Sequence, residues 1–147
     1  MPSWRDEASE SAQQDLDALL AIALPFAQQE LVKHGEFYPF AAAIDRTGKT
    51  EMIALQIEAG EKPQSAQVMA ECVQELARRR TQIRAGAVVV DVRLPDTGGD
   101  AISVELEHAE GQAITVLLPY RRRGLRQTIE YAPMRAEAGQ RRIWAPS

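Results

Sequence analysis

The chain has 147 residues, of which 45% are hydrophobic and 26% are charged, and its formal net charge is −4. This composition is typical of a folded globular protein and excludes a disordered chain, because there are enough apolar residues to form a core. The only cysteine, Cys72, excludes an intrachain disulfide and a cysteine-rich zinc site, and it suits a reducing compartment. With neither a signal-peptide pattern nor an apolar run of roughly 20 residues, we expect a cytoplasmic protein that does not enter a membrane. Residues 1–147 are expected to form a single domain.

The charge is unevenly distributed along the chain. Residues 120–147 contain seven arginines and two glutamates, which gives this segment a net charge of +5 and leaves −9 for the rest. Such an asymmetry can steer a partner toward one side of the molecule. The acidic body makes nucleic-acid binding an unfavoured prediction, since the phosphate backbone is recognised by clustered positive charge.

Residues 1–10 are polar and are expected to form a loose lead-in. Residues 11–34 have apolar side chains at intervals of three and four, which predicts an amphipathic helix with Ser11 or Asp15 as its N-cap. Pro25 lies inside this segment and predicts a kink or two abutting helices. Gly35 follows Lys33 and His34 and is a natural stop for the helix.

Two apolar runs, residues 37–45 and 50–57, flank a turn that contains Gly48 and predict a β-hairpin. Pro39 cannot donate a hydrogen bond within a sheet, so we expect it at the start or the edge of its strand. A second helix is predicted to open at Pro63 and to end at residues 78–80, with four side chains at core spacing: Met69, Cys72, Val73 and Leu76.

Three further strands are predicted at residues 85–94, 101–108 and 112–120, and residues 124–147 form a tail of undefined structure. In the middle strand Val104 and Glu105 are expected on opposite faces, because apolar and polar residues alternate. The predicted fold class is α+β, with the order α-β-β-α-β-β-β, a mainly antiparallel five-stranded sheet and the helices packed on one face. The expected buried sheet face consists of Ile53, Leu55, Val88, Val90, Val92, Ile102, Val104, Leu106, Ile114, Val116 and Leu118.

Several short motifs resemble a family of small soluble bacterial proteins of unknown function. The first is His34-Gly-Glu-Phe-Tyr-Pro-Phe40, which fits a pattern H-G-x-F-x-P-F, and the second is a strand that ends Leu118-Pro-Tyr-Arg-Arg-Arg123. The resemblance spans most of residues 16–123 and implies a bacterial cytoplasmic protein without assigning an activity. The element order is also similar to that of roadblock and longin-type modules, which implies a role in dimerisation.

The segment from His34 to Tyr38 contains the candidate catalytic residues. His34, Glu36 and Tyr38 place an imidazole, a carboxylate and a phenol at an element boundary, where His34 or Glu36 could act as a general acid or base. The structural alternative is that His34 and Gly35 end the helix while Phe37 and Phe40 fill the core.

Asp91, Glu105 and Glu107 are the weak candidates for a metal site. If the strand register allows it, these carboxylates could form a patch for a divalent cation on one face of the sheet. The alternative is a set of cross-strand ion pairs that includes Arg93. We expect no metal and no cofactor, because no established binding or catalytic motif is present.

An arginine cluster is the candidate anion-binding site. Arg121, Arg122, Arg123 and Arg126 could together hold a phosphate or an acidic partner, provided that the strand ends by Tyr120. If the strand continues past Tyr120, successive side chains point in opposite directions and the arginines cannot all converge on one anion. The alternative is that the arginines pair with the acidic body or with a second subunit.

The sequence favours a non-catalytic module that works by protein association. Val89, Ala113 and Leu117 are expected on the outward face of the sheet, a surface that a helix or a partner would cover. The partner is expected to be a second copy of the chain or a cognate bacterial protein, as for an immunity or adaptor factor. The alternative is a small enzyme or a ligand-binding protein that uses residues 34–38 and Arg121–Arg123 on an anionic or phosphorylated small molecule.

Overall fold

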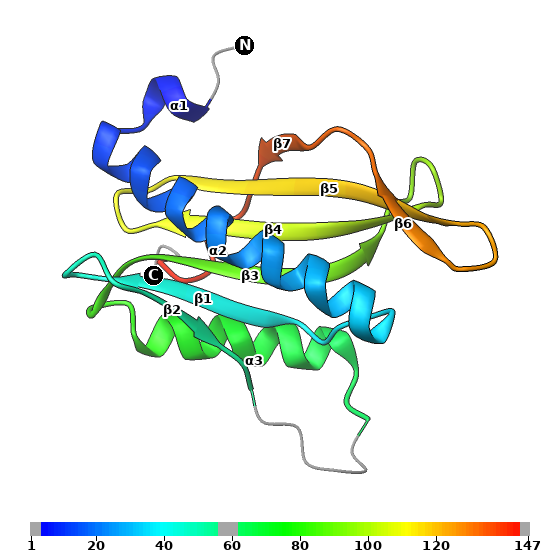
Figure 1. The fold of residues 1–147 in the computed structure, drawn as a ribbon. Helices are drawn as coiled ribbons and strands as arrows, with labels where there is room; N and C mark the ends of the chain where they lie inside the picture. Colours follow the sequence, from blue (N-terminus) through cyan, green and yellow to red (C-terminus); the bar gives the residue numbers. More distant parts are fainter. Residues whose placement is uncertain (1–3, 56–61, 145–147) are drawn as a thin grey trace.

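The computed structural model describes residues 4–55 and 62–144 of the chain (Figure 1). Its elements, in chain order, are α1 (Trp4–Glu7), α2 (Glu10–His34), β1 (Phe40–Asp45), β2 (Thr50–Ile53), α3 (Ser65–Arg78), β3 (Ile83–Arg93), β4 (Asp100–His108), β5 (Ala113–Arg123), β6 (Thr128–Tyr131) and β7 (Arg135–Ala138). Within these residues no helix combines the length and the hydropathy that crossing a membrane requires.

The strands form one antiparallel sheet in the order β2-β1-β3-β4-β5-β6. β7 also pairs with β5, over Ile114–Leu117, while β6 pairs with the last four residues of β5. The α+β class and the antiparallel sheet are therefore confirmed, but the expected count of five strands is too low. The two additional strands come from the tail after residue 124, which lacks long apolar runs.

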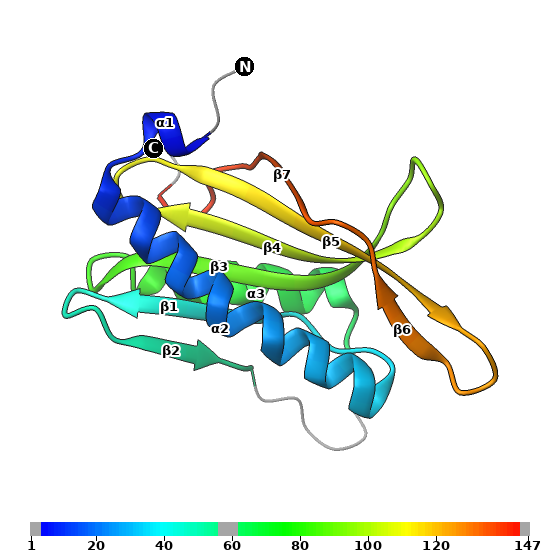
Figure 2. The ribbon, with the colours of Figure 1, turned by 45° about the horizontal axis from the view of Figure 1, so that its top comes forward.

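The two long helices cover opposite faces of the sheet, so the prediction that both pack on one face is wrong (Figure 2). Val89 is paired with Val104 and lies beneath α2, whereas Val88 and Val90 lie on the side of α3. β3 thus has apolar side chains on both faces, and each face needs its own cover. The uninterrupted Val88-Val89-Val90 run is the sequence signal for such a strand.

The expected single buried face is divided between the two sides of the sheet. Ile102, Val104 and their same-face neighbours pack under α2, and Ile53 packs under α3 together with Val88 and Val90. The surface expected to face outward is also covered by the chain itself. Val89 is buried under α2, and Leu117 is buried on the other face in a cluster with Leu94 and Ala101.

Helix α2 begins at Glu10, one residue before the predicted start, and continues without interruption through Pro25. Of the residues expected to form a loose lead-in, Trp4–Glu7 form the short helix α1. Its N-cap is Ser9, whose hydroxyl accepts a hydrogen bond from the backbone N–H of Ala12, rather than Ser11 or Asp15. Two abutting helices are therefore ruled out. Gly35 ends the helix in the left-handed conformation, with φ of 76°, and its N–H donates to the carbonyl of Leu31, as expected.

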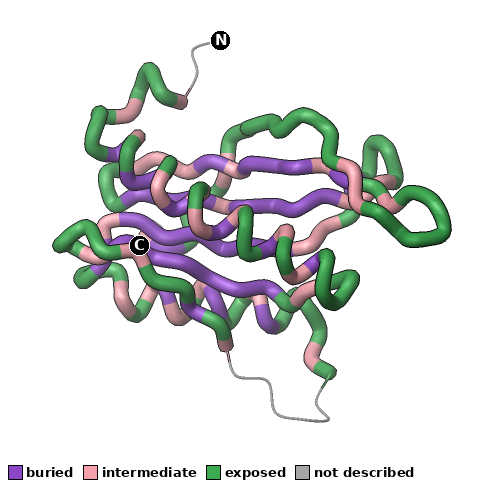
Figure 3. The backbone as a smooth tube through the Cα atoms, in the orientation of Figure 1, coloured by how far each residue is buried: buried purple, intermediate pink, exposed green. Residues whose placement is uncertain are grey.

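The hairpin and the second helix lie close to their predicted positions. β1 begins immediately after Pro39, which agrees with the expectation for a residue that cannot donate to the sheet. The last two residues of the second predicted strand, Gln56 and Ile57, lie outside the described residues. Figure 3 shows that the central strands are buried along most of their length, while the β6 and β7 region is exposed.

The end of the described chain is anchored to the sheet by Glu107. Its carboxylate accepts hydrogen bonds from the backbone N–H groups of Arg142, Ile143 and Trp144, at 2.6, 2.9 and 2.7 Å. Ile143 is buried among the side chains beneath α3. Residues 142–144 are thus fixed by one buried carboxylate and one apolar anchor.

Candidate functional site

A stripe of three side chains on α2 forms one wall of a pocket. Phe26, Glu30 and His34 are spaced by four residues, so a helix presents them on the same side. His34 Nε2 lies 3.4 Å from Glu30 Oε2, and the two side chains are 65% and 27% exposed. Because α2 ends at Gly35, the chain turns here and runs back toward the sheet.

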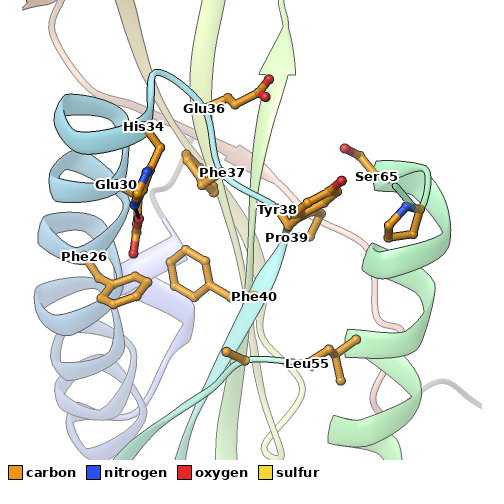
Figure 4. Close-up of a pocket in the computed structure, with 12 residues that line it drawn as sticks. Phe26, Glu30, His34, Glu36, Phe37, Tyr38, Pro39, Phe40, Leu55 and Ser65 are labelled. Carbon is orange, nitrogen blue, oxygen red and sulfur yellow. Dashed lines mark ion pairs between the residues drawn. The ribbon is translucent and has the colours of Figure 1, made fainter. Parts of the chain in front are cut away.

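The segment from Glu36 to Phe40 connects α2 to β1 and forms the floor of this pocket, which we call the aromatic pocket (Figure 4). Its far side consists of Ala54 and Leu55, which follow β2, and of Pro63 and Ser65 at the start of α3. The cavity has a volume of about 600 Å³. The helix end, the sheet and the second helix therefore meet around one concave surface.

Aromatic rings dominate the walls of the aromatic pocket. Phe40 is buried, and its ring packs edge to face against Phe26, with the ring centroids 4.9 Å apart and an interplanar angle of 71°. Phe37 lies 5.8 Å from Phe40 between ring centroids. Phe26 and Tyr38 nevertheless expose 36% and 40% of their surface, so two rings remain available for contact.

The charges on the pocket wall are acidic. Glu30 and Glu36 line it, and among the described lining residues there is no arginine or lysine. Arg122 comes close to the turn from outside the pocket, since its guanidinium donates to the carbonyl of Gly35. Arg122 also lies over the ring of Tyr120, with Cζ 5.5 Å from the ring centroid.

The arginine cluster does not converge on one point. β5 extends to Arg123, beyond the end required by the anion-site hypothesis, so successive side chains alternate between the two faces. Arg121 and Arg123 both pair with Glu130 at 3.3 Å, whereas Arg122 lies on the α2 side. Arg126 is exposed in the turn before β6. The alternative prediction named the acidic body or a second subunit as the partner, whereas Arg121 and Arg123 pair with Glu130, which belongs to their own arginine-rich segment of residues 120–147.

Asp91 and Tyr120 form a partly buried pair near the same end of the sheet. The Tyr120 hydroxyl donates to Asp91 Oδ1 at 2.6 Å. Burial raises the pKa of Asp91 above its ordinary value of 3.8, although the hydrogen bond from Tyr120 acts in the opposite direction. Burial also raises the pKa of Tyr120, and its hydrogen bond to Asp91 adds to that shift. Glu36 and Asp100 lie close enough to raise the pKa of Asp91 further.

The three carboxylates considered for a metal site are not brought together. Asp91 is paired with Ile102 on the α2 face, while Glu105 and Glu107 lie on the opposite face. Glu107 is occupied by the chain end, and Glu105 lies 3.4 Å from Arg142. In the described residues, no group of three or more metal-ligating side chains is found.

A buried polar network that the sequence analysis missed joins α2 to the sheet. Asp15 Oδ2 lies 2.8 Å from His108 Nε2, and Asp15 Oδ1 accepts a hydrogen bond from Arg84 at 2.8 Å. The N–H of Glu110 donates to His108 Nδ1. Because Nδ1 accepts, the proton of a neutral imidazole is on Nε2 and is donated to Asp15. Both partners of the Asp15 carboxylate lie on the sheet, and no local motif connects residues 93 positions apart.

The sequence analysis found His34, Glu36 and Tyr38 in this region but missed Phe26, Glu30 and the residues from β2 and α3. The spacing of four between Phe26, Glu30 and His34 was the signal that could have extended the site along α2. Leu55 and Ser65 reach the pocket only through the tertiary fold.

No known protein-family model, curated protein or solved structure matches this chain. The resemblances to a bacterial family and to roadblock and longin-type modules therefore stay predictions that depend on motifs and on element order.

Proposed function

We propose that this protein is a non-catalytic association module that receives a segment of a partner protein in the aromatic pocket. The observation that carries the proposal is the pair of exposed rings, Phe26 and Tyr38, on the wall of a cavity of about 600 Å³. Exposed aromatic side chains in a concave surface are favourable anchors for binding, because they lose little conformational entropy and bury a large area. A cytoplasmic location, which suits the single buried thiol of Cys72, is part of the proposal.

The proposal favours a different protein over a second copy of the chain. The symmetric contact expected from the sequence depended on Val89, Ala113 and Leu117 as outward-facing groups. Val89 and Leu117 are buried by the chain's own elements, and Ala113 is partly buried. The aromatic pocket is concave, so it fits a protruding segment better than it fits itself.

Binding is favoured over catalysis by the surroundings of the candidate acid and base. The His34 side chain is 65% exposed, and among the described residues its ion-pair partner is Glu30 on its own helix. A general acid or base accelerates a reaction most where water is excluded and a second group positions it. Recognition of an anionic small molecule is also less favoured, since Arg121 and Arg123 are paired with Glu130.

Photo-crosslinking in cells tests the proposal. A photoreactive phenylalanine analogue is placed at position 38, in the pocket, and in a matched strain at position 32 on α2, where Val32 is 75% exposed and is not among the described residues that line the pocket. We expect a discrete protein adduct from position 38 only. The adduct should disappear when Phe26→Ala is added, while circular dichroism shows that this variant stays folded.

Three results contradict the proposal. Equal adducts from both positions would show that contact at position 38 is nonspecific, and an adduct with twice the mass of the chain would assign the surface to self-association. An adduct that persists in the Phe26→Ala background would place the contact outside the aromatic pocket.

A further inference from the structure

We infer that the partner segment places a basic side chain, an arginine, in the aromatic pocket. The inference rests on the proposed function and adds the chemistry of the occupant. Three features of the pocket support it: the sign of its charges, the exposed faces of its rings and the position of a helix C-terminus.

The carboxylates around the pocket favour the binding of a cation. Glu30 and Glu36 are its charged lining residues apart from His34. Asp91 lies near Glu36 at the adjacent end of the sheet, and Asp100 lies near Asp91. In the described chain Glu36 has no ion pair within 4 Å, so its carboxylate is available to an incoming positive group. The nearest arginine, Arg122, is engaged by the carbonyl of Gly35 and the ring of Tyr120.

The end of α2 contributes its C-terminal carbonyl groups to this region, where Lys33 and His34 are the basic side chains of the last turn. The helix has 25 residues, and its C-terminus lies at His34 beside the pocket wall. The last carbonyl groups of a helix carry a partial negative charge, which attracts cations within the final turn. The Gly35 N–H donates a hydrogen bond to the carbonyl of Leu31. The carbonyl groups that follow Leu31 in the helix have no hydrogen-bond partner within the helix.

The aromatic rings favour arginine over other cations. Figure 4 shows Phe26 and Phe40 below the Glu30 and His34 pair, with Tyr38 on the other side of the cavity. A guanidinium is planar, stacks on aromatic faces and donates to carboxylates with several N–H groups. A pocket with rings on two sides and carboxylates at its rim matches each of these properties.

A series of host peptides that differ at one central residue tests the inference. The residue is arginine, citrulline, leucine or glutamate, and binding to the full-length protein is measured by isothermal titration calorimetry. Citrulline has nearly the shape of arginine without its charge. We expect arginine to bind about five- to thirty-fold more tightly than citrulline, which is the range for one cation–π contact and one or two partly exposed ion pairs.

Charge variants of the pocket provide the matched control. Glu36→Gln should weaken the arginine peptide about two- to five-fold without changing the affinity of the leucine peptide. Glu137→Gln removes the same charge from exposed β7 and should leave both affinities unchanged. Added salt should weaken the arginine peptide and not the leucine peptide.

The outcomes separate this inference from the proposed function. If leucine or glutamate peptides bind as tightly as arginine and lose affinity in Phe26→Ala, the inference is wrong while the pocket remains the binding site. If no peptide loses affinity in Phe26→Ala, both are wrong. If N-acetyl-arginine amide binds as tightly as the arginine peptide, the site belongs to a free small cation, and the assignment to a protein partner is overturned.

Discussion

Burial changes the chemistry of single side chains in this protein, and Cys72 is the clearest case. The thiol is fully buried on α3, where its Sγ lies 3.7 Å from the carbonyl of Pro39. Burial, with a smaller effect of Glu71, raises its pKa to about 11. A thiol reacts through its thiolate, so both access and protonation oppose reaction.

We predict that Cys72 does not react with a thiol-specific chromogenic disulfide at neutral pH while the protein is folded. In denaturant the same reagent should label one thiol per chain, because unfolding removes the burial that suppresses the thiolate. Absorbance at the two conditions measures the difference. Immediate stoichiometric labelling of the folded protein would contradict the assignment of Cys72 to the core.

Asp91 provides a prediction about pH. Its pKa is raised above 3.8 in the folded protein, chiefly by burial, so the folded state binds a proton more strongly than the unfolded state does. Stability therefore decreases as the pH rises from 3.8 through the raised pKa. In Asp91→Asn this loss is absent, and the hydrogen bond from Tyr120 is retained by the amide oxygen.

Urea unfolding of both proteins at about pH 3 and about pH 7 measures this effect. The free energy of unfolding of Asp91→Asn, relative to that of the wild type, should increase from the lower to the higher pH. Glu105 has a pKa raised by burial as well, but it is present in both proteins and cancels. A difference that is constant with pH would show that Asp91 is not desolvated.

At the residue scale, alternation predicted which neighbours face apart. Val104 and Glu105 lie on opposite faces, as expected, and His108 shares the side of Leu106. Alternation along one strand could not show which of its side chains share a sheet face with those of the neighbouring strand. Asp91 was grouped with Glu105 because register depends on the turn between β3 and β4, and a shift by one residue exchanges the two faces.

At the scale of elements, α2 is joined to the sheet by its buried carboxylate as well as by its apolar stripe. Asp15 is 6% exposed and is shared by Arg84 and His108, whereas Asp17, two residues later, is 48% exposed and pairs with Arg5. The two aspartates therefore provide a matched pair of sites on one helix.

We predict that Asp15→Ala destabilises the protein by about 3–5 kcal/mol, because it leaves buried polar partners unpaired. Asp17→Ala should cost about 1 kcal/mol or less, since it removes an exposed ion pair. Chemical denaturation of both variants measures the difference. Equal effects would mean that the Asp15 network does not hold α2 in place.

The C-terminal segment makes a second contact between elements that can be measured. A Cβ atom at Gly86 would lie 2.8 Å from Ile143 Cδ1 and 3.3 Å from the methyl groups of Leu76. Gly86→Ala should therefore destabilise the protein by about 1–3 kcal/mol through overpacking. Combined with Ile143→Ala, the same substitution should cost less, because the closest contact has been removed. Additive effects in the double-mutant cycle would contradict the docking of Ile143 on Gly86.

Helices α2 and α3 and the five strands before residue 124 could be predicted because each has a strong local pattern, whereas the four residues of α1 were expected to belong to a loose lead-in. The division of the helices between the two sheet faces could not be predicted. The buried Val88-Val89-Val90 run indicates apolar side chains on both faces of β3, but it does not show which helix covers which face. β6 and β7 were missed because their short, exposed segments have little apolar periodicity, and their strand geometry depends on pairing with β5.

At the scale of the whole molecule, the described part of the chain has an acidic, aromatic concavity at the end of α2 and an arginine-rich end of β5. His34, Glu36 and Tyr38, the candidates from the sequence, line this concavity. The alternative predicted function joined residues 34–38 to Arg121–Arg123 as one site for an anionic ligand. In the structure only Arg122 touches the turn, and it does so through a backbone carbonyl. The pocket itself comes from three parts of the chain that no local pattern connects: the end of α2, the end of β2 and the start of α3.

The most direct test of this account is to map binding on the isotopically labelled protein by NMR. The arginine host peptide, the leucine host peptide and inorganic phosphate are titrated separately, and the amide signals that shift are assigned. We predict that the peptides shift residues 26–40 together with Leu55 and Ser65, and that the arginine peptide causes the larger change. Peptide-induced shifts confined to residues 121–126, or phosphate binding there without peptide binding at the pocket, would contradict it.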